Sequence, residues 1–134
     1  MRRLNVRGAV AAEFALLLPV LLLILFGIIE FGMIMYGREV VTNASREGAR
    51  AGIVQRIPAV TAGEITTVAT NYLTGTGISL AQVTIAVPAS GGGTGTPVTV
   101  TATYRYQWLI PYITTLLGLP APLPIAMSTT MLHE

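Results

Sequence analysis

The sequence predicts an α+β fold: a long N-terminal transmembrane helix that extends into water, a second helix, and then a small antiparallel β-sheet of about three strands. Three observations support this class. Residues 14–29 form an uncharged apolar run, and the helical pattern continues through residues 37–56. Residues 98–106 then alternate between apolar and polar side chains, which is typical of a strand with one buried face.

The apolar run is long enough to cross a bilayer. Residues 9–36 are mostly apolar and are interrupted only by Glu13 and Glu30. A hydrocarbon core of about 30 Å requires about 20 helical residues. A cleaved secretory signal peptide is the alternative, but its apolar region usually spans about 7–15 residues and ends at a small-residue cleavage site. We therefore expect this helix to remain in the protein as a single membrane span.

Charged residues are few and unevenly distributed. Only 10% of residues are charged and 52% are hydrophobic, whereas soluble domains usually carry about 25% charged residues. All eight basic residues are arginines, and Arg2, Arg3 and Arg7 precede the apolar run. Arginines before a span favour a cytoplasmic N-terminus, so the C-terminal domain is expected in the periplasm or outside the cell.

Three parts of the chain follow from this distribution. We expect a basic leader at residues 1–8, the membrane helix with its extension at 9–56, and a small extracytoplasmic α+β domain at 57–134. Pro58 suits the first position of a helix, so the second helix is predicted over residues 58–74. Gly75 and Gly77 end it.

The remaining sequence has the period of a sheet. Strands are predicted at residues 83–87, 98–106 and 125–132, and the glycine-rich residues 89–97 connect the first two as an antiparallel hairpin. Residues 107–120 form an apolar excursion with one or two helical turns. The middle strand places Val98, Val100, Ala102, Tyr104 and Tyr106 on one face and Thr99, Thr101, Thr103 and Arg105 on the other.

Catalytic chemistry is poorly supported by this sequence. His133 is the only histidine, and the chain contains neither Cys nor Asp. The glycines of residues 91–95 do not open a helix and no Lys follows them, so they do not match a phosphate-binding loop. No basic patch with interleaved aromatic residues indicates nucleic-acid binding. We therefore predict that the protein is not an enzyme and binds no metal, cofactor, small-molecule substrate or nucleic acid.

The start of the chain resembles the processing site of type IV prepilins. Gly8 is followed by four residues, then by Glu13 and the apolar helix. The resemblance implies that a membrane prepilin peptidase cuts after Gly8, so that Ala9 becomes the N-terminus and Glu13 the fifth residue. A carboxylate in apolar surroundings usually has a partner, and the new ammonium group of a neighbouring subunit could neutralise Glu13. Alternatively, Glu13 is solvated in the headgroup region beside Arg7.

A longer segment, residues 7–52, resembles the TadE-like family, the pseudopilins of the tight-adherence (Flp) pilus system. Matching pieces are the RGxxxxEFAL start, Pro19, the FGIIEFG segment and the tail NASREGAR at residues 43–50. The resemblance implies a minor pilin or pseudopilin in the bacterial cytoplasmic membrane or in the pilus itself. Its implied partners are the lipid bilayer, the prepilin peptidase, other pilins and the assembly machinery. Ala9 stands where major pilins usually carry Phe, which argues against a major pilin.

Four further charged residues could contact other subunits. Glu30 is the 22nd residue counted from Ala9, or about 33 Å along a helix, so it could instead lie at headgroup level on the periplasmic side. Arg46, Glu47 and Arg50 could form an intersubunit charge network or a solvated helix face.

Two other functions remain open. The first is an unprocessed, signal-anchored protein with an extracytoplasmic binding domain. The second is a relative of the general-secretion pseudopilins, which share the processing site but lack the tail at residues 43–50.

Overall fold

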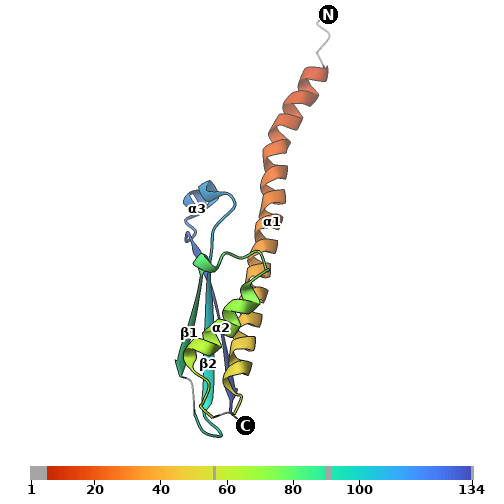
Figure 1. Ribbon diagram of the computed structural model, residues 1–134. Coiled ribbons are helices and arrows are strands. Elements are labelled where there is room, and N and C mark those ends of the chain that lie inside the picture. The colour runs from red at the N-terminus through yellow and green to blue at the C-terminus, as the bar shows by residue number, and fades with distance from the viewer. Residues whose placement is uncertain (1–5, 56, 90–91, 134) are drawn as a thin grey trace, which may run out of the picture. The chain divides into compact units, whose positions relative to one another are not determined.

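The computed structural model describes residues 6–55, 57–89 and 92–133 (Figure 1). The predicted α+β fold is confirmed, with one long apolar helix, a second helix and a three-stranded antiparallel sheet. Arg2, Arg3 and Arg56 lie outside the described residues. The chain divides into two compact units, residues 1–33 and 34–134, and each is described below by itself.

The first helix, α1 (Val6–Gly52), is continuous over 47 residues and contributes to both units. Pro19 lies inside it without ending it. The predicted extension beyond the apolar run is therefore confirmed, although the helix stops at Gly52 and not at residue 56. Ile53 closes its last turn with a backbone hydrogen bond from its N–H to the carbonyl of Ala49, 3.2 Å long.

The sheet in the second unit has the order β1-β2-β3, and both pairings are antiparallel. Its strands are β1 (Val83–Ala89), β2 (Pro97–Tyr106) and β3 (Leu123–Leu132), close to the predicted ranges. The register of β1 against β2 shifts between Ala86 and Ala89, whereas β2 and β3 pair without interruption from Pro97 opposite Leu132 to Tyr106 opposite Leu123.

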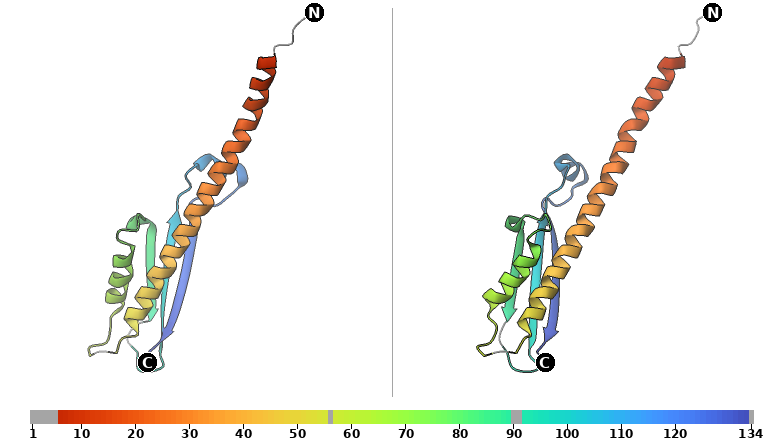
Figure 2. Two further views of the ribbon diagram at one scale, coloured as in Figure 1. Left: turned by 90° about the vertical axis from the view of Figure 1, so that its right-hand side faces the viewer. Right: turned by 45° about the vertical axis from the view of Figure 1, so that its right-hand side comes forward.

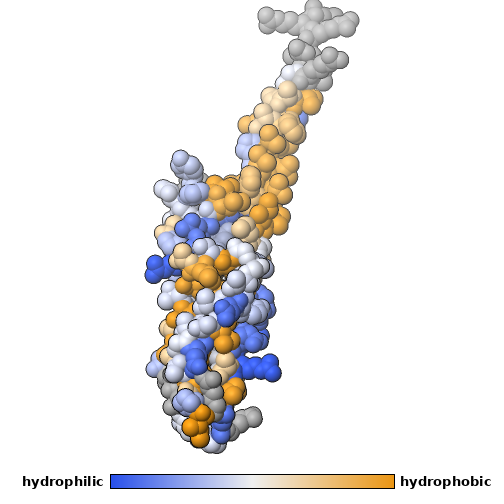
Figure 3. All heavy atoms as spheres, in the orientation of Figure 1, coloured by the Kyte–Doolittle hydropathy of each residue, from blue (hydrophilic) through white to orange (hydrophobic). Residues whose placement is uncertain are grey.

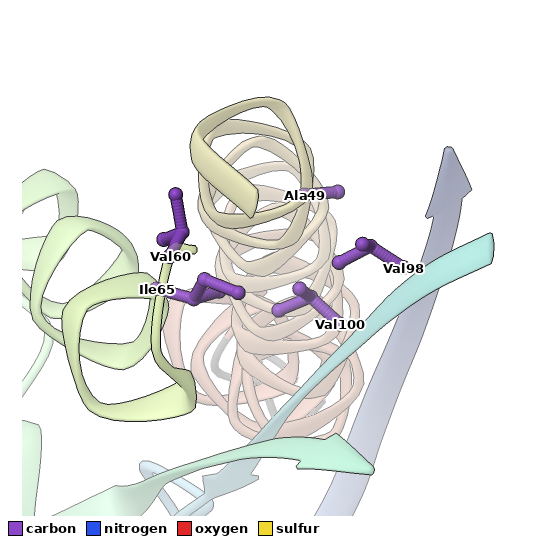
Figure 4. Close-up of a cluster of buried hydrophobic side chains, with 5 residues drawn as sticks. All are labelled: Ala49, Val60, Ile65, Val98 and Val100. Carbon is purple, nitrogen blue, oxygen red and sulfur yellow. The ribbon is translucent and has the colours of Figure 1, made fainter. Parts of the chain in front are cut away.

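One face of this sheet forms the core. The predicted alternation along β2 is confirmed, because Val98, Val100, Ala102, Tyr104 and Tyr106 are all buried. Figure 4 shows a cluster from this core, in which two valines of the sheet meet side chains from both helices and from the segment before α2; its members are Ala49, Val60, Ile65, Val98 and Val100. The C-terminal half of α1 and the second helix therefore cover the same face of the sheet (Figure 2).

The second helix, α2 (Ala62–Leu73), begins four residues later than predicted. The prediction that Pro58 occupies its first position is wrong, because Thr61 caps the helix instead. The Thr61 hydroxyl accepts a hydrogen bond from the Glu64 N–H, and the Glu64 carboxylate accepts one from the Thr61 N–H. This capping box satisfies two otherwise free backbone donors, which a proline start cannot do. Gly75 follows the helix with a φ of 91°.

The connection from β2 to β3 contains one short helix, α3 (Pro111–Leu117), as the apolar excursion predicted. Gly118 ends this helix in a left-handed conformation with a φ of 64°. A single 3-10 turn, η1 (Leu80–Gln82), leads into β1 and was not predicted from the sequence.

Three glycines of α1 allow its second half to lie close to the sheet. A Cβ atom added to Gly37 would come 2.9 Å from Tyr104 Cε1. One added to Gly48 would come 3.2 Å from Val100 Cγ1, and one added to Gly52 would come 2.8 Å from Val98 Cγ1. These side chains follow each other along β2, so α1 runs antiparallel to that strand.

Candidate functional site

The first part of α1 presents an apolar surface that the chain itself does not cover. Every side chain from residue 8 to residue 25 is exposed, and Leu16 retains 76% of its accessible surface. Among the described helices, α1 is the one long and apolar enough to cross a membrane. The apolar segment of α1 is largely orange in the hydropathy view of Figure 3. Large aliphatic side chains at every turn fit a lipid environment and are costly in water.

Glu13 is the one charged side chain within this bare segment, residues 8–25. It is exposed, and it makes no hydrogen bond or ion pair with any other residue that the structure describes. Gly8 and Ala9 lie one turn before it on the same helix. Because residues four apart share a helix face, Ala9 and Glu13 point to the same side of α1.

Glu30 is in a different environment from Glu13. Glu30 is only 9% exposed, whereas Glu13 is exposed. The residues between the two glutamates carry no charge. At 1.5 Å per residue they separate the carboxylates by about 26 Å along the helix, close to the thickness of a hydrocarbon core.

The predicted charge cluster on the second half of α1 lies on its outer side. Arg46, Glu47 and Arg50 are exposed, while Ser45 and Ala49 on the opposite side are buried. None of the three charged side chains forms an ion pair with another residue in the described ranges. They are therefore available to groups outside this chain.

Two polar contacts of α1 were not predicted from the sequence. Ser45 is fully buried, and its hydroxyl lies 2.7 Å from the Thr129 hydroxyl on β3 and donates to the Thr42 carbonyl at 2.8 Å. Tyr36 donates a hydrogen bond of 2.6 Å to the Thr76 carbonyl after α2. No sequence signal identifies these pairs, because their members are 84 and 40 residues apart.

His133 lies in a pocket at the end of the sheet where α1 terminates. Its side chain is 5% exposed, and Gly92, Gly93 and Thr94 line the pocket beside it. Neither ring nitrogen has a hydrogen-bond partner among the described residues. The Thr94 hydroxyl accepts a bond of 3.1 Å from Gln55. The described residues that line this pocket include no carboxylate.

The comparison with known proteins finds a family for the segment that contains the apolar helix. Residues 8–50 match the family model of TadE-like proteins. This confirms the resemblance seen in the sequence, and the match begins at Gly8 and ends at Arg50. The TadE-like segment thus contains Glu13, Glu30 and the exposed charge cluster of α1. Neither the curated proteins nor the solved structures include a match to the chain.

Proposed function

We propose that this protein is a minor pilin or pseudopilin that acts structurally in the assembly of a Tad/Flp-type pilus. The observation that carries the proposal is the exposed Glu13 on an otherwise bare apolar helix within the TadE-like segment. In this proposal α1 anchors the chain in the bacterial cytoplasmic membrane. The N-terminus faces the cytoplasm, and residues 34–134 lie on the other side.

An unpartnered carboxylate in a membrane is unfavourable by roughly 2.5–3.5 kcal/mol near the helix centre on insertion scales. Such residues usually pair with a group of opposite charge. No described residue of this chain supplies that partner for Glu13. Cleavage after Gly8 would create an ammonium group on Ala9, and the Ala9 of a neighbouring subunit could then pair with Glu13. Pairing between subunits would also fix the axial stagger of adjacent helices.

Gly8 is suited to recognition by a prepilin peptidase. Gly8 is exposed, and a Cβ atom added to it would meet nothing within 4 Å outside its own helix backbone. Glycine also weakens a helix by about 1 kcal/mol relative to alanine, which favours local opening around the scissile bond. The basic residues before Gly8 would remain on the cytoplasmic side as a leader.

In this proposal the second unit determines which other subunits the protein contacts. Its half of α1 is fixed against the sheet by Gly37, Gly48 and Gly52, so the exposed Arg46 and Arg50 are presented from a rigid surface. In this proposal they contact other pilins or the assembly machinery. The role is structural and not enzymatic, and it requires no cofactor.

Mass spectrometry of the membrane-extracted protein tests the proposal, with and without the prepilin peptidase in the cells. We expect the mature chain to begin at Ala9 when the peptidase is present. Gly8→Val should block trimming, whereas Glu13→Gln should be trimmed but fail to enter high-molecular-weight assemblies. Glu39→Gln is a matched control on the exposed side of the second unit and should both trim and assemble. An untrimmed chain that never assembles would instead support a signal-anchored binding protein.

A further inference from the structure

We propose that the connection between β2 and β3, residues 107–122, docks into the boundary between lipid headgroups and acyl chains. This inference rests on the proposed membrane insertion of α1. A hairpin between β2 and β3 needs only a few residues, so the sheet does not require a connection of this length. The inference gives this apolar excursion a function.

The position of this connection within the second unit is defined by contacts of α1. Gly52 packs beside Val98 at the start of β2, and Gly37 packs beside Tyr104 near its end. Ile34, the first residue of the unit, packs on the cluster that contains Tyr106. The connection therefore leaves the sheet at the end where the chain continues into the apolar segment of α1.

The chemistry of the connection matches a membrane interface. Between Arg105 and Glu134 the sequence contains no Asp, Glu, Lys or Arg. Tyr112 is 86% exposed, Leu117 is 64% exposed and Leu109 is 53% exposed. Leu109 and Leu117 are large apolar side chains that the chain leaves more than half exposed. Tryptophan and tyrosine beside leucine are the residues enriched at the membrane–water boundary.

The connection is also ordered before any partner binds. Trp108 donates a hydrogen bond of 2.8 Å to the Pro120 carbonyl, which joins the two ends of the segment. The N–H of Leu119 donates to the Thr114 carbonyl at 2.9 Å. Trp108 stacks edge-to-face on Tyr106 in the core, with ring centroids 6.0 Å apart. These bonds hold Tyr112 and Leu117 outward, so their exposure does not result from an unstructured loop.

The lipid bilayer is the occupant that these observations favour. The segment has no charge, and it combines Trp108 and Tyr112 with leucines, the composition of the membrane–water boundary. It also leaves the sheet beside the cluster on which Ile34 packs, and Ile34 directly follows the apolar segment of α1 in the sequence.

The test uses the whole chain in phosphatidylcholine vesicles with an environment-sensitive dye on single cysteines. The protein has no cysteine, so Tyr112→Cys, Leu117→Cys and the control Ala59→Cys each give one label. Ala59 is exposed and adjoins Val60, which packs at the opposite end of the sheet. We expect lipid-borne quenchers to act several-fold more strongly on labels at 112 and 117 than on the label at 59. Trp108, the only tryptophan, provides a label-free readout with brominated lipids.

Flotation of the same vesicles separates the two proposals. Protein that floats while its labels at 112 and 117 remain accessible to aqueous quenchers would overturn lipid docking and leave membrane insertion of α1 intact. Labels that become buried only in assembled pili would overturn it in favour of a protein partner. Protein that does not float would overturn the membrane span and this inference together. Replacing Tyr112 and Leu117 by Glu should abolish quenching of Trp108 without preventing flotation.

Discussion

The hydroxyl groups of Ser45 and Thr129 lie 2.7 Å apart in the interior of the second unit, joining α1 to the edge strand β3. Ser45 also donates to the carbonyl of Thr42, so the Thr129 hydroxyl is the donor in the pair. This is a partly buried polar contact between helix and sheet, and it fixes the rotation of α1 as well as its distance from β3. Apolar packing alone specifies rotation less strictly.

Ser45→Ala should therefore destabilise the second unit. The substitution leaves the Thr129 hydroxyl without its partner, at an expected cost of about 1–3 kcal/mol. Thermal unfolding of the full chain in detergent, followed by near-ultraviolet circular dichroism, measures the effect. Ser128→Ala is the control, because it removes an exposed bond of 3.1 Å from Thr101 on the outer face of the sheet. An equal loss of stability in both variants would contradict this account.

Gly52→Ala should also destabilise the protein, although alanine favours helix by about 1 kcal/mol. Its Cβ would come 2.8 Å from both Ile65 Cδ1 and Val98 Cγ1, and overpacking of this kind costs about 1–3 kcal/mol. Gly63→Ala in α2 is the matched control, since its nearest heavy atom outside the helix backbone lies 4.0 Å away. The control should be neutral or slightly stabilising by urea unfolding. A stabilised Gly52→Ala variant would show that the helix and sheet are not closely packed there.

Thr61→Ala should lower stability by about 1 kcal/mol through loss of the helix cap. The hydroxyl accepts from the Glu64 N–H at 3.3 Å, and the variant leaves that donor without its partner. Thr67→Ala removes a threonine whose hydroxyl only donates to the carbonyl one turn earlier, 2.8 Å away, so it should have little effect. Urea unfolding of the two variants provides the comparison, and equal midpoints would show that the cap contributes nothing.

The main elements of the fold were predictable because their signals are local. Sixteen uncharged apolar positions specify the first part of α1, and strict alternation specifies β2. The start of α2 was placed incorrectly because Pro58 and Thr61 both signal a helix start, and the capping box of Thr61 with Glu64 determines the actual start. Proline at this point only permits a helix, whereas the cap stabilises one.

The candidate site was predictable to a smaller extent. The spacing of Gly8 and Glu13 and the position of Glu30 are sequence properties, and the family match contains all three. The contact of Ser45 with Thr129 and the exposure of Tyr112 depend on how distant segments pack, so no local pattern reveals them. The apolar excursion was visible in the sequence, but its position beside the start of the second unit was not.

Alkaline pH should destabilise the second unit through Tyr104. Burial raises the pKa of this phenol above its ordinary value of 10.0, because the charged form loses solvation in the core. The folded state thus holds the proton more tightly than the unfolded state. Stability is fully present below the unfolded pKa and falls as the pH rises through the folded pKa. Urea unfolding at pH values on both sides of about 10 should show this loss, and Tyr104→Phe should reduce it.

Reversing the charges of Arg46 and Arg50 should impair assembly without affecting the fold. Both side chains are exposed on α1 and make no ion pair with the described residues, so Arg46→Glu with Arg50→Glu should change stability by no more than about 1 kcal/mol, the effect of the Arg50 charge on the helix dipole. If they contact neighbouring pilins, the double variant should be trimmed and inserted normally but be depleted from high-molecular-weight assemblies. Arg105→Glu, an exposed reversal on β2, is the control for a general effect of charge. Normal assembly of the double variant would show that Arg46 and Arg50 form only a solvated helix face.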